Sequence, residues 1–128
     1  MPVREYFNGI RNHVQQFPFS AMVEIEEEIR TTSIGYIVIK VTYIDGSELF
    51  YREFVSTETT PPARYSYSFH YHKNSSLIFR YDNAPHFKDI FTFPHHKHLP
   101  DGTVVPSTAP TIETILAEIS SILLSQNI

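Results

Sequence analysis

The chain has 128 residues, of which 41% are hydrophobic and 19% charged, with a formal net charge of −4. A chain of this length buries roughly two-thirds of its unfolded surface, so we expect residues 1–128 to form a single domain around one core. The absence of cysteine excludes disulfides, thiolate metal sites and cysteine nucleophiles. No apolar run approaches the roughly 18 residues of a membrane span and no segment resembles a signal peptide, so we expect a cytoplasmic protein without membrane association.

The charges are distributed unevenly. Residues 1–61 carry five basic and nine acidic side chains, residues 62–98 carry five basic and two acidic, and residues 99–128 carry three acidic and no basic ones. Six of the seven histidines also lie in the middle segment. Any anion-binding surface is therefore expected there, and it should strengthen as the pH falls through about 6.5.

Helical and strand patterns alternate in the first half of the chain. Apolar residues recur at helical spacing over residues 3–14, and Phe17-Pro18 is typical of a helix end. Residues 23–29 alternate between apolar and acidic, which predicts a strand with a wet, acidic face over residues 24–28. That face is expected to be solvated, and binding of a basic partner there stays open as the alternative.

Two hairpins follow. Asp45-Gly46 favours a type I′ turn after the β-branched run 34–43, and this turn would bury the pairs Val41:Phe50 and Ile37:Phe54 on one face. In the second hairpin, aromatic residues alternate with serine and histidine, and Lys73-Asn74-Ser75 is predicted to be a three-residue loop. One face of this hairpin would then pair Ser68 with Arg80, Ser66 with Asp82 and His70 with Ile78.

The remaining chain is expected to be a histidine-rich loop over residues 83–106, with one short strand at residues 90–93, and then an amphipathic helix over residues 112–123. Thr108 or Thr111 is the candidate N-cap of this helix. The fold class is thus α+β: an N-terminal helix, an antiparallel sheet of about five strands, a His-rich loop and a C-terminal amphipathic helix.

The functional centre is predicted in residues 82–98, DNAPHFKDIFTFPHHKH. Imidazole and carboxylate groups suit a divalent zinc, nickel or manganese ion, with His86, His95, His96 and His98 as the candidate ligands. The spacing of these histidines matches no established zinc motif. The structural alternative is that the imidazoles cap loop carbonyls or lie in solvent.

Metal-free cleavage of RNA is the second chemical interpretation, and it needs no cofactor. Attack by a 2′-hydroxyl requires a base, an acid and a cation for the charge that develops on the phosphate. For Arg80 and Asp82, a structural ion pair is the alternative. The predicted catalytic residues are Arg80, Asp82, His86, His95, His96 and His98, and the predicted substrate-binding residues are Ser68, His70, Tyr81 and Lys97.

Three segments of the sequence together resemble the TumE toxin family: Arg64-Tyr65-Ser66-Tyr67, LIFRYDNAPH at residues 77–86 and FPHHKH at residues 93–98. The resemblance covers residues 20 to 120. It implies the toxin of a prokaryotic type II toxin–antitoxin module, with a small DNA-binding antitoxin as partner and RNA as a candidate target. The order of elements departs from that of RelE-type ribonucleases, so their mechanism is not carried over.

Two other classes of function stay open from the sequence alone. A metal-dependent hydrolase would use the histidine cluster for metal binding and catalysis. A non-enzymatic module would use the basic, aromatic hairpin to hold nucleic acid or protein. An exposed edge strand would also allow a homodimer.

Overall fold

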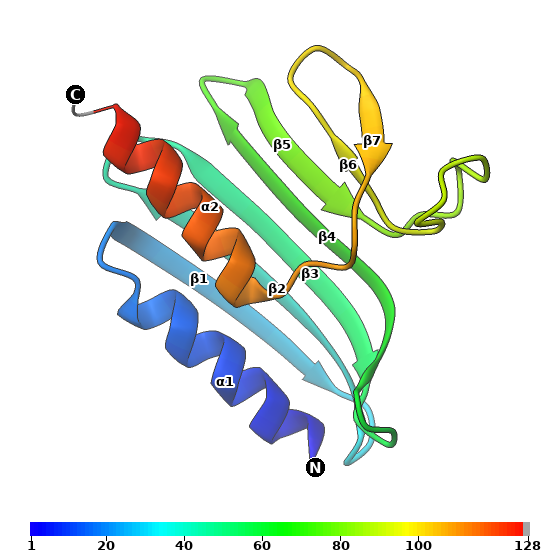
Figure 1. Ribbon diagram of the computed structural model, residues 1–128. Helices are drawn as coiled ribbons and strands as arrows, with labels where there is room; N and C mark the ends of the chain where they lie inside the picture. Colours follow the sequence, from blue (N-terminus) through cyan, green and yellow to red (C-terminus); the bar gives the residue numbers. More distant parts are fainter. Residues whose placement is uncertain (127–128) are drawn as a thin grey trace.

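The computed structural model describes residues 1–126 and has one antiparallel sheet with two helices on the same face (Figure 1). The α+β class with terminal helices is confirmed, but the sheet has seven strands where about five were expected, and their order across the sheet follows the chain. No helix in the described residues is long and apolar enough to span a membrane. The elements are α1 (Val3–Gln16), β1 (Ser20–Ile29), β2 (Ile34–Tyr43), β3 (Glu48–Ser56), β4 (Ala63–Lys73), β5 (Ser76–Asp82), β6 (His96–His98), β7 (Val104–Pro106) and α2 (Ile112–Ser125).

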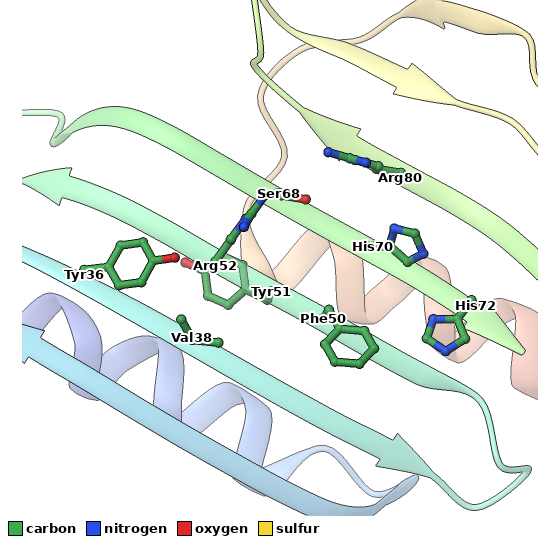
Figure 2. Close-up of a pocket in the computed structure, with 9 residues that line it drawn as sticks. All are labelled: Tyr36, Val38, Phe50, Tyr51, Arg52, Ser68, His70, His72 and Arg80. Carbon is green, nitrogen blue, oxygen red and sulfur yellow. The ribbon is translucent and has the colours of Figure 1, made fainter. Parts of the chain in front are cut away.

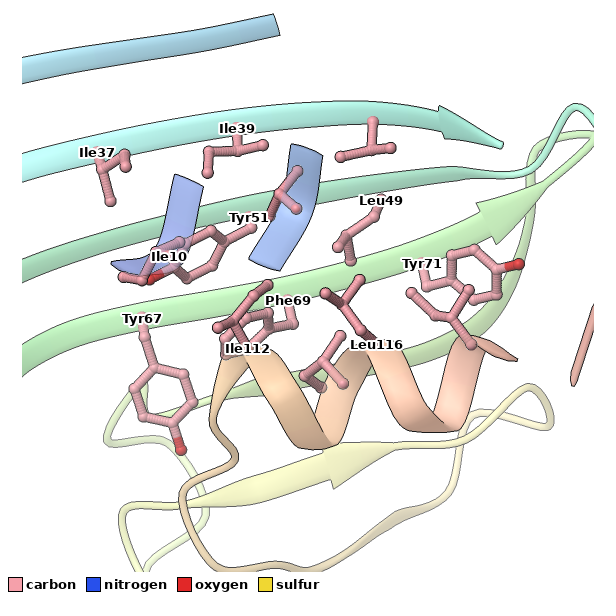
Figure 3. Close-up of a cluster of buried hydrophobic side chains, with 14 of the residues drawn as sticks. Ile10, Ile37, Ile39, Leu49, Tyr51, Tyr67, Phe69, Tyr71, Ile112 and Leu116 are labelled. Carbon is pink, nitrogen blue, oxygen red and sulfur yellow. The ribbon is translucent and has the colours of Figure 1, made fainter. Parts of the chain in front are cut away.

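The core lies between the helices and one face of the sheet (Figure 3). Helix α1 buries its predicted apolar stripe, and it approaches β2 closely at Gly35, where an added Cβ would lie 2.9 Å from the ring of Phe7. Helix α2 begins at the predicted N-cap Thr111, whose hydroxyl accepts a hydrogen bond from the backbone of Thr114. Because both helices cover the same face, no helix within residues 1–126 lies on the opposite face of the sheet.

The first hairpin corrects our predicted register by one residue. Val41 pairs with Leu49, and the predicted partner Phe50 lies 41% exposed. A type I′ turn needs a positive φ at both central residues, but in the Asp45-Gly46 pair only Gly46 has one, and the loop contains three residues. A slip of one residue moves every side chain of β3 to the other face, so Glu53 enters the core in place of Phe54.

The second hairpin differs from the prediction by two residues. Its turn is the pair Asn74-Ser75, both with positive φ, and β5 contains a bulge at Ile78. Ser68 therefore pairs with Asp82 and not with Arg80. Beyond the bulge, a shift of two residues keeps Ser68, His70, Arg80 and Asp82 on their predicted face. Ile78, predicted on that face, packs against the core instead.

The histidine-rich segment is more regular than predicted. Residues 90–93 form a turn, in which the amide of Phe93 donates to the carbonyl of Ile90, so the strand predicted there is wrong. The strand lies further on, at β6, and pairs with both β5 and β7. This pairing carries the last three residues of the histidine cluster onto the sheet beside Asp82.

Strand β1 forms one edge of the sheet and pairs only with β2 among the described residues. Glu24, Glu26 and Glu28 are exposed on the face without helices, as the alternating pattern predicted. Glu27 points the other way and forms an ion pair with Arg11 of α1. The open face thus begins with an acidic edge.

Candidate functional site

A groove crosses the open face of the sheet (Figure 2). Its larger part has a volume of about 550 Å³, and a second part of about 320 Å³ continues it toward the end of β5. Both parts share the side chains of Arg52 and Arg80, which come from β3 and β5. The lining combines cations, hydroxyls and rings: Tyr36, Phe50, Arg52, Ser68, His70, His72 and Arg80 in the larger part, and Tyr65, Ser66, Asp82 and Asn83 in the continuation.

Three side chains at the end of the groove converge on the carboxylate of Asp82. Nε of Arg80 lies 3.0 Å and Nε2 of His98 lies 3.3 Å from Oδ2, and Nε2 of His96 lies 2.9 Å from Oδ1. The strand register explains this convergence, because Asp82 pairs with His96 and Arg80 pairs with His98. Asp82 is 3% exposed, so this buried carboxylate is surrounded by basic side chains.

His96 is held in one orientation by its second ring nitrogen. Its Nδ1 lies 3.0 Å from the backbone carbonyl of Pro94, and its ring is 2% exposed. Its Nε2 makes no hydrogen bond, although it lies close to Asp82. Nε of Arg80 is likewise near the carboxylate without a hydrogen bond to it. Neither contact is therefore a hydrogen bond, although each brings a ring or guanidinium nitrogen to within 3.0 Å of the carboxylate.

The loop between β5 and β6 covers one side of this cluster. The ring of Phe87 packs edge-on against His96, with centroids 4.8 Å apart, and against His98 at 5.8 Å. The amide of Ala84 donates to Oδ1 of Asp82 at 3.0 Å, which fixes the start of the loop. The loop thus shields the carboxylate and the imidazole of His96 from water, whereas the ring of His98 stays partly exposed.

Several predicted site residues lie away from the cluster. Tyr81 and Lys97 face the helices, where both donate to the carboxylate of Glu118 on α2. His95 also lies on that side, with Nδ1 2.8 Å from the hydroxyl of Tyr67. His86 is exposed in the loop. Lys97 faces the helices because neighbouring residues of a strand point to opposite faces of the sheet. Within β6, Lys97 therefore points away from His96 and His98 on either side of it.

Ser68 and His70 lie where the hairpin pattern predicted, on the same face as Arg80 (Figure 2). Partial burial lowers the pKa of His70 below its usual 6.5, and the nearby charges of His72, Arg80 and His98 lower it further. At neutral pH the imidazole of His70 is therefore uncharged. It is available in the groove as a proton acceptor beside a guanidinium.

Sequence reasoning missed the contribution of β2 and β3. Tyr36, Phe50 and Arg52 line the groove opposite His70, but the predicted register placed Phe50 in the core. The ring of Phe50 stacks on His72, with centroids 5.5 Å apart and an angle of 11° between the planes. The predicted and observed arrangements differ in the length of the loop at Asp45-Gly46. A prediction of three loop residues there would have placed Phe50 on the open face.

The comparisons with known proteins agree with the resemblance seen in the sequence. A family model described as Toxin TumE matches residues 10–123, a span that includes the groove and the whole Asp82 cluster. No curated protein and no solved structure matches the chain. Since the family match covers most of the sequence, the chain belongs to the TumE toxin family.

Proposed function

We propose that this protein is the toxin of a type II toxin–antitoxin module and that it cleaves RNA at the end of the open-face groove. The family match supports the role of a toxin. The observation that carries the proposed reaction is the convergence of Arg80, His96 and His98 on the buried carboxylate of Asp82, next to a groove lined by cations and rings. A phosphate bound there would meet the guanidinium of Arg80 within a partly water-excluded site, where electrostatic stabilisation is strongest.

The groove supports RNA as the substrate. Tyr65 is 55% exposed and Phe50 is 41% exposed, so each offers a ring on which an unpaired base would stack. Arg52 and Arg80 line both parts of the groove and would hold the phosphates, because a planar guanidinium binds phosphate through two parallel hydrogen bonds. The RNA strand would therefore cross the open face of the sheet from Phe50 toward Asp82.

The proposed chemistry is attack of a 2′-hydroxyl on the adjacent phosphorus, which forms a 2′,3′-cyclic phosphate and breaks the bond from phosphorus to the 5′-oxygen. This oxygen leaves as a hydroxyl after taking a proton from water in the groove. The uncharged imidazole of His70 would accept the proton of the hydroxyl, and Arg80 would neutralise the charge that develops on the phosphate oxygens. Asp82 would orient Arg80. Lys97, which the sequence suggested as a further cation, has no part in this proposal because it pairs with Glu118 on the helix side.

A small DNA-binding antitoxin is the proposed partner, and the cytoplasm is the proposed compartment, since such a toxin meets its RNA target and its antitoxin there. The free edge of β1 is the proposed pairing surface for a partner strand, from the antitoxin or from a second copy in a homodimer. Its acidic side chains Glu24, Glu26 and Glu28 would favour a basic segment.

Expression in a bacterial host tests the proposed function. The wild-type chain is expected to arrest growth and fragment cellular RNA, whereas Asp82→Asn should restore growth because Arg80 loses the charge that orients it. Asp89→Asn, in the exposed part of the loop, is the matched control and should stay toxic. His70→Gln, which changes only a groove-lining side chain, should also restore growth, and it covers the case in which Asp82→Asn fails to fold.

Two results would overturn the proposal. One is normal growth with intact RNA when the wild-type chain accumulates as folded protein. The other is toxicity that persists unchanged in folded Asp82→Asn and in His70→Gln. Growth and RNA integrity should be measured together, because a toxin that acts on another target would arrest growth without fragmenting RNA.

A further inference from the structure

We propose that Asp82, His96 and His98 bind one divalent transition-metal ion of the zinc class. One ligand atom from each of the three residues lies within 4.8 Å of the others, and Asp82 and His96 are buried. Two imidazoles and one carboxylate suit zinc, nickel or manganese better than magnesium, which prefers oxygen ligands. These ligands differ from those predicted from the sequence: Asp82 joins His96 and His98, whereas His86 and His95 lie outside the group.

The hydrogen bonding of His96 carries the inference. A backbone carbonyl can only accept a hydrogen bond, so the contact of Nδ1 with Pro94 places a hydrogen on Nδ1. In a neutral imidazole, Nε2 then presents a lone pair. The same arrangement, with one nitrogen donating to a carbonyl and the other free, fixes the tautomer and orientation of histidines that bind metals.

The free nitrogen faces a carboxylate, and a cation bound between the two would stabilise this contact. Nε2 of His96 lies 2.9 Å from Oδ1 of Asp82 and forms no hydrogen bond. Two electron-rich atoms at this distance repel each other unless a positive charge lies near both. An extra proton on Nε2 would create a buried imidazolium that makes no hydrogen bond to its counter-ion, which is costly. A metal ion satisfies both groups.

His98 and Arg80 define the remaining surroundings of the site. Nε2 of His98, 3.3 Å from Oδ2 of Asp82, supplies the second nitrogen. The guanidinium of Arg80 lies on the groove side of the same oxygen and is 37% exposed, so it can turn toward a phosphate when a metal ion takes up the carboxylate. Three protein ligands leave a coordination position open for water or a phosphate oxygen, as in catalytic zinc sites.

The role of the metal rests on the proposed function, but its binding does not. A bound divalent ion would take up negative charge from the phosphate alongside Arg80, while His70 still accepts the proton. The proposal therefore adds an electrophile to the cleavage site. It assigns His96 and His98 to metal binding rather than to proton transfer.

Metal titration of the purified full chain tests this inference. After treatment with a chelator and its removal, calorimetric titration with Zn²⁺ is expected to show one ion bound per chain. His98→Gln, whose ring is partly exposed, should weaken binding by at least about tenfold, and His96→Gln should do the same. His86→Gln is the matched control and should bind as the wild type does, because His86 lies outside the cluster. Thermal unfolding without metal identifies any variant that fails to fold.

The inference is overturned if the folded wild-type chain binds no Zn²⁺, Ni²⁺ or Mn²⁺, or if His86→Gln weakens binding as much as His98→Gln. Failure of the two proposals is distinguishable. Metal binding in a chain that never cleaves RNA would remove the proposed function and leave the metal site. Full RNA cleavage by chelator-treated protein would remove the metal from the proposed mechanism, and titration alone would decide whether the site exists.

Discussion

Replacing Glu53 by glutamine is expected to lower the free energy of unfolding by about 3 kcal/mol or more, the usual cost of leaving one partner of a buried ion pair without the other. Glu53 is 1% exposed and accepts hydrogen bonds from the hydroxyls of Tyr6 at 2.7 Å and Tyr51 at 2.6 Å. Its other oxygen pairs with Arg64, which also donates to the carbonyl of Pro110 at 2.7 Å. This carboxylate thus ties α1, the sheet and the entry to α2 together, and a neutral amide would leave the guanidinium without its counter-charge.

Urea denaturation of the two proteins measures this difference. Glu26→Gln makes the same chemical change on the exposed face of β1 and should alter stability by no more than about 0.5 kcal/mol. Equal stability of Glu53→Gln and Glu26→Gln would show that the buried ion pair contributes nothing net to the fold. Glu53→Gln leaves the open-face groove intact, so any activity that remains should belong to the folded fraction.

Replacing Arg80 by alanine is expected to lower kcat/KM for RNA cleavage by about 10²–10³, the usual cost of removing one preorganised group that stabilises transition-state charge. Arg80 lines both parts of the groove and lies beside the buried carboxylate of Asp82. Arg80→Lys keeps the charge but loses the planar fork, so its rate should lie between those of the wild type and Arg80→Ala. Cleavage of a labelled single-stranded RNA by purified proteins gives the three rates.

Lys88→Ala is the control for loss of a single positive charge, since Lys88 is exposed in the loop between β5 and β6. It should cleave at close to the wild-type rate. If Lys88→Ala and Arg80→Ala lose the same small amount of activity, Arg80 contributes only to the general charge of the surface. The unfolding midpoint of each variant separates an effect on the reaction from an effect on the fold.

The helices and the first strand follow from periodicity in the sequence, because an amphipathic pattern is local and survives tertiary packing. The helical spacing of apolar residues predicted α1 and α2, and the alternation of Ile25 with its acidic neighbours predicted β1. The register between two strands does not follow from periodicity, because it depends on the φ angles of one or two turn residues. At Asp45 the expected positive φ is absent, and this single difference moved Phe50 out of the core and Glu53 into it.

The candidate site was partly accessible from the sequence for the same reasons. The alternation in β4 and β5 placed Ser68, His70 and Arg80 on one face despite a shift in partners. The sequence did not show that residues 96–98 form a strand, because three residues carry no recognisable period. Without that strand, nothing separates Lys97 from its neighbours, and nothing brings His96 to Asp82.

Cleavage of a short single-stranded RNA by the purified protein, compared with the same RNA methylated at every 2′-hydroxyl, tests whether the groove uses a 2′-hydroxyl as the nucleophile. If the groove of this toxin positions a 2′-hydroxyl for attack beside Arg80 and Asp82, the unmodified RNA should be cut and the methylated RNA should remain whole. Intact unmodified RNA, or equal cleavage of both, would show that this protein does not cleave RNA through a 2′-hydroxyl in the groove.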